Sequence, residues 1–372
     1  MKFTAQTDVL KSITGIFTKA ADKTALSETS GIYIEVSGTT VSFKMHQFDF
    51  FISYTIEGTD CSDGTIFVAP QALDTVIVPI IDALTTIELS GSKLLVRTKS
   101  SESDLFTLSL EDRNVFLVDT ASIADKKPTV SLQREVVIRG FKDVQHAAAE
   151  SVVKPEIASV YLYTKGETVY FAATDGFRLA ETRFLAENVD ADVGIIIPIK
   201  NVQKIVRILE NSADTDVHLF VEGDTVHLRT ETVYIRTSSV QGTFPNYAAI
   251  IPASFAAEIT VIKKDILNFL KKARLFSNKL NRLSFGVHDE KNIFLSFSNE
   301  TAGSTKNIIA ASVKGQVTAF PSFNYLFVSD ALSVIPDDRV VLKLVDDSTK
   351  PLTICGATDT SLITIVSPLL EE

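Results

Sequence analysis

The chain has few of the residues that mark disulfide-rich, secreted or membrane-spanning proteins. Only two of its 372 residues are cysteines, Cys61 and Cys355. They allow at most one disulfide and lack metal-ligand spacing, so we expect a reducing compartment, the cytoplasm. The N-terminal residues are polar where a signal peptide needs an apolar stretch. The most apolar run, residues 76–81, contains Pro79 and is far shorter than the ~18 residues of a membrane-spanning helix.

Motifs that carry catalysis are also missing. The sequence contains no G-x-S-x-G nucleophile elbow, no G-x-x-x-x-G-K phosphate loop, no H-E-x-x-H and no G-x-G-x-x-G. Its five histidines are scattered singly and suggest no acid–base or metal cluster. We therefore expect no enzymatic activity, no metal and no cofactor. An enzyme with an unrecognised site at a domain junction is the least favoured alternative.

An internal repeat is the most informative feature of the sequence. Residues 32–43, 160–171 and 283–294 each read as an alternating strand, a polar turn and a second alternating strand, which predicts a β-hairpin. Successive copies are offset by 128 and 123 residues. Pro70, Pro198 and Pro321 keep the same two offsets, and each is predicted to open a helix.

The repeat predicts three domains of one α+β class. An acid precedes an amphipathic run near Asp8, Glu135 and Asp265, so each copy begins with a helix and contains a second one. Two helices on antiparallel sheets make a stable layered domain of about 120 residues. We place the domains at residues 1–122, 123–252 and 253–372, with boundaries in charged or proline-containing connectors.

Positive charge gathers on predicted helices although the chain carries a net charge of −10. Residues 263–279 contain six cations against Asp265 alone, and Lys200, Lys204 and Arg207 are spaced along one face of a helix. Lysines on a single helix often serve solubility alone. Repetition across three domains favours a positive surface facing a polyanion, with contacts to phosphates and no sequence preference.

The segment Ala173-Thr174-Asp175-Gly176-Phe177-Arg178-Leu179-Ala180 closely resembles a signature of the bacterial DNA polymerase III beta subunit family, the sliding clamps. Residues 1–4, 242–247, 250–252, 277–279 and 363–368 add further matches, so the resemblance covers the whole chain in order. It implies three clamp domains per chain and a head-to-tail homodimer closed into a six-domain ring around duplex DNA. Such a ring tethers the replicative polymerase and serves the clamp loader and other partners.

The pattern of cations and the resemblance together give three sets of functional residues. The DNA-facing set comprises Lys23, Arg134, Lys200, Lys204, Arg207, Lys264, Lys271 and Lys272. The dimer seam sets Phe106 and Leu108 of one copy against Leu275 and Phe276 of the other. The pocket for a short partner peptide comprises Ile157, Thr174, Gly176, Phe177, Arg178, Leu179, Pro245, Ile250, Leu280, Ile365, Val366, Ser367, Pro368 and Leu369.

The pocket residues are mostly apolar with one cation, which suits leucine and aromatic side chains of an extended peptide. Phe177, Ala249 and the acidic end 370–372 depart from common family residues, so partner preference is expected to differ. The seam residues predict an interface held mainly by apolar contact and strand pairing. A repeat-built interaction scaffold that uses the same pocket without encircling DNA is the main alternative.

Overall fold

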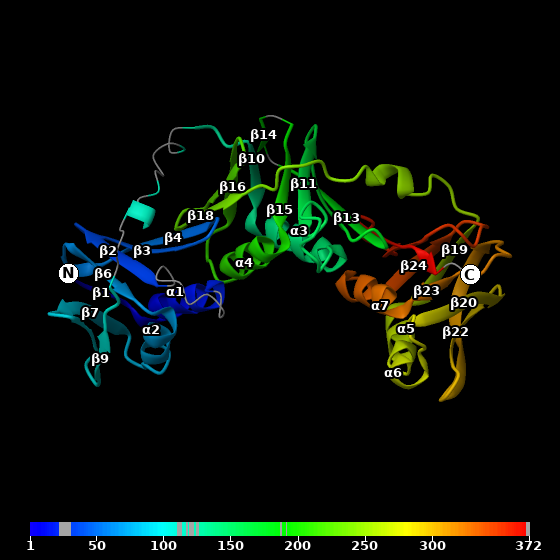
Figure 1. Cartoon of the computed structure of the whole chain (residues 1–372), viewed down its shortest axis with the longest axis horizontal. Coiled ribbons are helices and arrows are strands. Elements are labelled where there is room, and N and C mark those ends of the chain that lie inside the picture. Colours follow the sequence, from blue (N-terminus) through cyan, green and yellow to red (C-terminus); the bar gives the residue numbers. More distant parts are fainter. Residues whose placement is uncertain are drawn as a thin grey trace. The chain divides into compact units, whose positions relative to one another are not determined.

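The computed structural model of the chain describes residues 1–21, 31–109, 114–116, 118, 123, 126–186, 188–190 and 192–369. Its described helices and strands divide between two compact units (Figure 1). Unit 1 comprises Met1–Ile138 and Ala186–Val240, and unit 2 comprises Arg139–Leu185 and Gln241–Glu372. Among the described residues, no helix has the length and apolar character needed to cross a bilayer.

The first repeat contains two helices and a series of short strands. In chain order the elements are β1 (Lys2–Gln6), α1 (Thr7–Ala20), β2 (Ile32–Ser37), β3 (Thr40–Gln47), β4 (Phe50–Glu57), β5 (Thr59–Ser62), β6 (Gly64–Val68), α2 (Pro70–Ile77), β7 (Leu84–Ser90), β8 (Lys93–Arg97), β9 (Glu102–Phe106) and the 3-10 helix η1 (Asn114–Phe116). Helix α1 buries Leu10, Ile13 and Phe17, whose spacing of three and four residues gives one apolar face.

The second repeat has the same order of helices and hairpins. Its elements are β10 (Val130–Gln133), α3 (Arg134–Val144), η3 (Gln145–Ala147), β11 (Ser159–Lys165), β12 (Thr168–Thr174), β13 (Arg178–Leu185), β14 (Asn188–Val189), β15 (Gly194–Pro198), α4 (Ile199–Glu210), β16 (Asp216–Glu222), β17 (Thr225–Arg229), β18 (Val233–Ser238) and η4 (Tyr247–Ile250).

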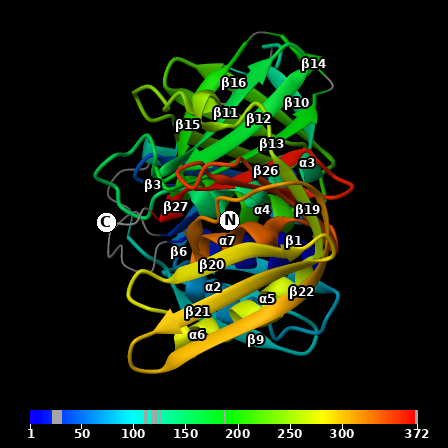
Figure 2. The ribbon, with the colours of Figure 1, turned by 90° about the vertical axis from the view of Figure 1, so that its right-hand side faces the viewer.

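The third repeat follows the same plan but includes a 13-residue strand, β22. Its elements are β19 (Ala257–Ile262), α5 (Lys263–Leu270), α6 (Ala273–Phe276), β20 (Arg282–Asp289), β21 (Asn292–Asn299), β22 (Gly303–Gly315), β23 (Ser322–Asn324), α7 (Tyr325–Val334), β24 (Arg339–Leu344), β25 (Leu352–Gly356), β26 (Leu362–Val366) and β27 (Pro368–Leu369). Figure 2 looks onto β20, β21 and β22, which are hydrogen-bonded side by side.

The three predicted hairpins are confirmed. They are β2–β3, β11–β12 and β20–β21, each antiparallel. Gly38 and Gly166 turn the first two with φ near +60°, a conformation that costs glycine little. In the third hairpin the Asp289 carboxylate accepts a hydrogen bond from the Lys291 backbone N–H at 2.7 Å. A side-chain acceptor thus stabilises the turn where no glycine is present.

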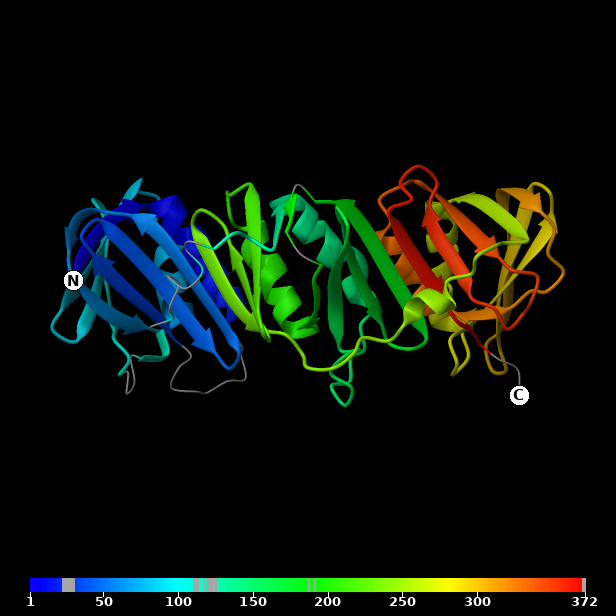
Figure 3. The same cartoon turned by 90° about the horizontal axis from the view of Figure 1, so that it is seen from above.

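Sheets continue from one repeat into the next. In unit 1, β18 of the second repeat pairs with β4 of the first, with Ile235 opposite Ile52. In unit 2, β13 of the second repeat pairs with β26 of the third, with Leu179 opposite Ile365 (Figure 3). The second repeat therefore contributes to both units, which explains why these units do not coincide with the three predicted domains. The predicted domain boundaries stay predictions.

The prolines mark helix starts less uniformly than the sequence predicts. Helix α2 begins at Pro70, and α4 begins one residue after Pro198. The prediction is wrong for Pro321, because α7 begins only at Tyr325. Residues 322–324 first form β23, and the Asn324 side chain then accepts a hydrogen bond from the Leu326 backbone N–H. An asparagine N-cap therefore sets this helix start.

Two helical glycines give a matched test of packing. A Cβ on Gly140 of α3 would lie 2.4 Å from the buried Phe171 ring, whereas a Cβ on Gly15 of α1 would meet nothing within 4 Å. We expect Gly140→Ala to lower the free energy of unfolding by about 1–3 kcal/mol through overpacking. Gly15→Ala should raise it by up to ~1 kcal/mol. Urea denaturation with hydrogen exchange in each unit measures the change in the free energy of unfolding for each variant. Equal changes in the two variants would show that packing around the glycines does not decide the effect.

Candidate functional site

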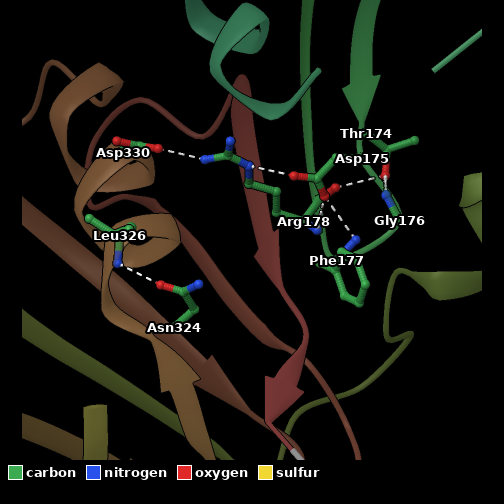
Figure 4. Close-up of polar contacts among 8 residues, drawn as sticks. All are labelled: Thr174, Asp175, Gly176, Phe177, Arg178, Asn324, Leu326 and Asp330. Atoms are coloured by element: carbon green, nitrogen blue, oxygen red, sulfur yellow. Dashed lines mark hydrogen bonds and ion pairs between the residues drawn. The ribbon is translucent and has the colours of Figure 1, made fainter. Parts of the chain in front are cut away.

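The turn between β12 and β13 presents the signature segment. The Thr174 hydroxyl donates to the Arg178 carbonyl at 2.7 Å and accepts from the Gly176 backbone N–H at 3.1 Å. The Asp175 carboxylate accepts from the backbone N–H groups of Phe177 and Arg178 at 2.8 and 3.0 Å (Figure 4). With its backbone held in this way, the turn leaves the Phe177 side chain 67% exposed.

Strand pairing brings this turn to the C-terminal part of the chain. Arg178 lies opposite Val366, and the Ser367 backbone N–H donates to the Phe177 carbonyl at 2.9 Å. The next two residues form β27, in which Pro368 pairs with Phe323. The structure therefore joins two predicted groups of pocket residues, 174–179 and 365–369. Within the described residues, no backbone hydrogen bond or strand pair ties the other four members to them: Ile157, Pro245, Ile250 and Leu280.

Aromatic residues anchor the connector that carries Pro245 and Ile250. The Tyr247 hydroxyl hydrogen-bonds to the Tyr163 hydroxyl at 2.8 Å and donates to the Glu181 carboxylate. Burial, followed by the hydrogen bond to Glu181, raises the pKa of Tyr247, so it remains a neutral donor. Burial also raises the pKa of Tyr163 to about 12. These contacts fasten η4 to the β11–β13 sheet and leave Ile250 exposed.

The one cation of the predicted pocket is already neutralised. The Arg178 guanidinium donates to Asp175 at 2.9 Å and to Asp330 of α7 at 2.5 Å, and it lies 4.4 Å from the centre of the Phe327 ring (Figure 4). Burial, with a smaller effect of Arg178, lowers the pKa of neighbouring His146 to about 4 and keeps that imidazole neutral at pH 7. Arg178 thus links β13 to α7 rather than offering a charge to a ligand.

The pocket residues differ in their exposure to solvent. Leu179 of β13 is 3% exposed, and its neighbours Thr174 of β12 and Ile365 and Val366 of β26 are also buried. The exposed members are Gly176, Phe177, Pro245, Ile250 and Leu280. Ile157, Arg178, Ser367, Pro368 and Leu369 are half-buried. The exposed apolar members are available to a ligand, whereas the buried ones support the sheet beneath them.

Most of the predicted DNA-facing cations lie at the surface of helices or directly after them. Lys200 and Arg207 are exposed on α4, Lys264 is exposed on α5, and Lys271 and Lys272 are exposed at the end of α5. Arg134 is half-buried and pairs with Glu135 at 2.5 Å. Lys23 lies outside the described residues.

Lys204 corrects the prediction of a three-residue basic stripe. Its side chain is only 7% exposed, with the ammonium 5.3 Å from the centre of the Phe50 ring. The β4–β18 pairing brings the start of β4 beside α4, where Asn201 also donates to Asp49 at 2.8 Å. The helix face that carries Lys204 is therefore packed against the first repeat, which the spacing of the cations could not reveal.

The predicted seam residues lie beside open strand edges. Strand β9 ends the β5-β1-β7-β8-β9 sheet, and Phe106 on it is 78% exposed. In unit 2, residues 303–310 of β22 pair with β21, and no other described strand pairs with them. Leu108 and Leu275 are exposed, and Phe276 is half-buried. Open edges of this kind are templates for pairing with another chain.

Sequence reasoning missed the groups that position the turn and its connector. These are Tyr163, Glu181, Tyr247, Phe327 and Asp330. Apart from the match that includes Tyr247, the sequence gave no signal for them, because their partners are distant along the chain. Together the fold and the site define a protein built from three copies of one α+β module, with exposed cations on its helices and an exposed phenylalanine on the turn between β12 and β13.

Comparison with known proteins identifies the family. Models described as the central and C-terminal domains of the DNA polymerase III beta subunit match residues 131–246 and 248–369. A beta sliding clamp from Rickettsia bellii is 22% identical over 357 residues, which cover 92% of each chain. The DNA polymerase III beta subunit of Thermotoga maritima shares the fold over both full chains, with a TM-score of 0.88 at 20% identity.

A DnaN sliding clamp from Pseudomonas aeruginosa, in a crystal structure with bound griselimycin, also shares the fold over both full chains. Its TM-score is 0.88 at 19% identity. The two domain models together match more than half of the sequence. The chain therefore belongs to the DNA polymerase III beta subunit family.

Proposed function

We propose that this protein is a DNA sliding clamp that holds the replicative polymerase on its template. Two copies, each with domains at 1–122, 123–252 and 253–372, close head to tail into a ring around duplex DNA. Membership of the DNA polymerase III beta subunit family is the observation that carries this proposal. The protein acts without catalysis and without a cofactor, in the cytoplasm. The two cysteines, both free thiols, are consistent with a reducing compartment.

Encirclement explains how a chain with a net negative charge can remain bound to DNA. A closed ring stays on DNA because of its topology, so its contacts need only be weak and directed at phosphates. The exposed cations Lys200, Arg207, Lys264 and Lys271 suit such contacts because phosphate attraction carries no sequence information. The net charge of −10 disfavours binding to DNA elsewhere on the surface.

The apolar surface around Phe177 is the proposed docking site for partners. The exposed side chains of Phe177, Ile250 and Leu280 suit leucine and aromatic anchors of a short extended peptide. The replicative polymerase, the clamp loader and other proteins with such a peptide would use this site in turn.

The experiment that tests the clamp is retention on DNA of different topology. Labelled protein is loaded onto a nicked circular plasmid by its clamp loader and ATP, and the plasmid is then isolated with or without linearisation. A clamp stays on the circle and is lost from the linear DNA. Equal retention on both forms would exclude encirclement, and binding of partner peptide without any DNA retention would favour a scaffold.

Charge reversal tests the helix cations in the same assay. Lys200→Glu combined with Arg207→Glu should reduce loading roughly tenfold at physiological salt, because two phosphate contacts are lost and repulsion is added. Lys165→Glu combined with Lys291→Glu makes the same change of charge at two exposed positions, the end of β11 and the turn between β20 and β21. If this control pair lowered loading equally, net charge rather than the α4 surface would explain the effect.

A further inference from the structure

Unit 2 contains a cavity of about 660 Å³ beside the proposed peptide site. Its lining includes Leu280, which is also one of the predicted pocket residues. The other side chains important here are Lys279, Arg282, Ser284, Ser298 and Glu300. The cavity thus adjoins the apolar surface through Leu280 but has a different chemistry.

Strand register gives a second link between the cavity and the peptide site. Arg282 of β20 lies opposite Asn324 of β23, and Ser322 of β23 lies opposite Leu369 of β27. Phe323 lies opposite Pro368, the residue that follows Ser367. Because neighbouring strands lie ~4.8 Å apart, β20 and β27 are roughly 10 Å apart across β23. The backbone of Ser367 is in turn hydrogen-bonded to Phe177.

The cavity supplies the positive charge that the apolar surface lacks. Lys279 is exposed, and no ion pair of Lys279 is found in the described part of the chain. Arg282 adds a guanidinium and Ser284 and Ser298 add hydroxyl donors, against the single carboxylate of Glu300. Carboxylates are the natural ligands of such a set.

We propose that this cavity binds acidic residues that flank the apolar anchors of a partner peptide. The inference rests on the proposed function, since it extends the same peptide site. Phe177 and Leu280 would hold the apolar anchors, while Lys279 would attract the acidic flank. Arg178 cannot take this role because Asp175 and Asp330 already neutralise it. Peptide flanks, and not the apolar anchors alone, would then determine which partners bind most tightly.

Labelled synthetic peptides test the proposal. One carries leucine and phenylalanine in a serine and glutamine context, and the others add three aspartates or three lysines at either end. We expect one aspartate-extended peptide to bind wild type about tenfold more tightly than the plain peptide at low salt, by fluorescence anisotropy. Lysine extensions should weaken binding. Higher salt should remove most of the difference.

Variants of two exposed lysines locate the effect. Lys279→Glu should abolish the increase in affinity that the aspartates give and leave the affinity for the plain peptide unchanged. Lys291→Glu, in the hairpin turn of the same repeat, should keep that increase.

The proposal about the cavity is wrong if the plain peptide binds and aspartates do not increase its affinity, or if Lys279→Glu keeps the increase. Either result leaves the proposed peptide site intact. If no peptide binds the wild-type protein, the cavity proposal and the proposed peptide site are both wrong. If Lys279→Glu changes only the affinity for a duplex oligonucleotide, Lys279 contacts DNA and the cavity proposal is wrong.

Discussion

Replacing Phe106 with aspartate should convert the proposed dimer into a monomer, raising its dissociation constant at least a thousandfold. Phe106 is 78% exposed on the edge strand β9, so the free chain loses little packing. Burying a phenylalanine contributes about 2–3 kcal/mol, and a carboxylate in its place adds a desolvation cost. A head-to-tail ring has two equal seams, so one substitution acts twice. Sedimentation velocity over nanomolar to micromolar concentrations measures the change.

A matched variant and a mixing experiment sharpen this test. Leu185→Asp removes an apolar side chain that is 79% exposed and outside the predicted seam, so it should leave the dimer intact. Leu275→Asp should also give monomers. An equimolar mixture of Phe106→Asp and Leu275→Asp chains should regain dimers at tens of micromolar, because one of its two seams contains only native residues. Monomers in that mixture would show that the two patches do not meet.

Local sequence patterns predicted the secondary structure well. Alternation with a period of two located the three hairpins, and an acid before an amphipathic run located α1, α3 and α5. Both signals are local, because they depend on which side of a strand or helix each residue occupies. Pro321 predicted the wrong helix start because the start depends on the capping group, which is Asn324 in α7.

Exposure and charge at the candidate site depended on contacts that sequence does not display. Lys204 and Arg178 both read as available cations. Lys204 is buried because β4 of the first repeat pairs with β18 of the second, and Arg178 is neutralised partly by Asp330, 152 positions away. The resemblance to a family nominated segments for the peptide site, but only the fold distinguishes a buried residue such as Leu179 from an exposed one such as Phe177.

That distinction determines the variant with which to test the peptide site. Leu179→Asp would place a carboxylate in the β13–β26 core, where its desolvation disrupts the sheet, so a loss of peptide binding would be ambiguous. Phe177→Asp combined with Leu280→Asp changes two exposed side chains and should preserve the fold. If each contributes about 1.5 kcal/mol to binding, affinity for the plain peptide falls roughly a hundredfold.

The control is Phe48→Asp, which removes a phenylalanine that is 76% exposed in unit 1. Phe48 has a φ of 54°, which aspartate tolerates better than a bulky residue, so this variant should fold at least as well as wild type. Its peptide affinity should be unchanged. Circular dichroism and dimer mass establish that the Phe177 and Leu280 double variant is folded. If the folded double variant binds the peptide with wild-type affinity, Phe177 and Leu280 do not form the peptide site. The other, buried residues of the predicted pocket cannot contact a peptide by themselves.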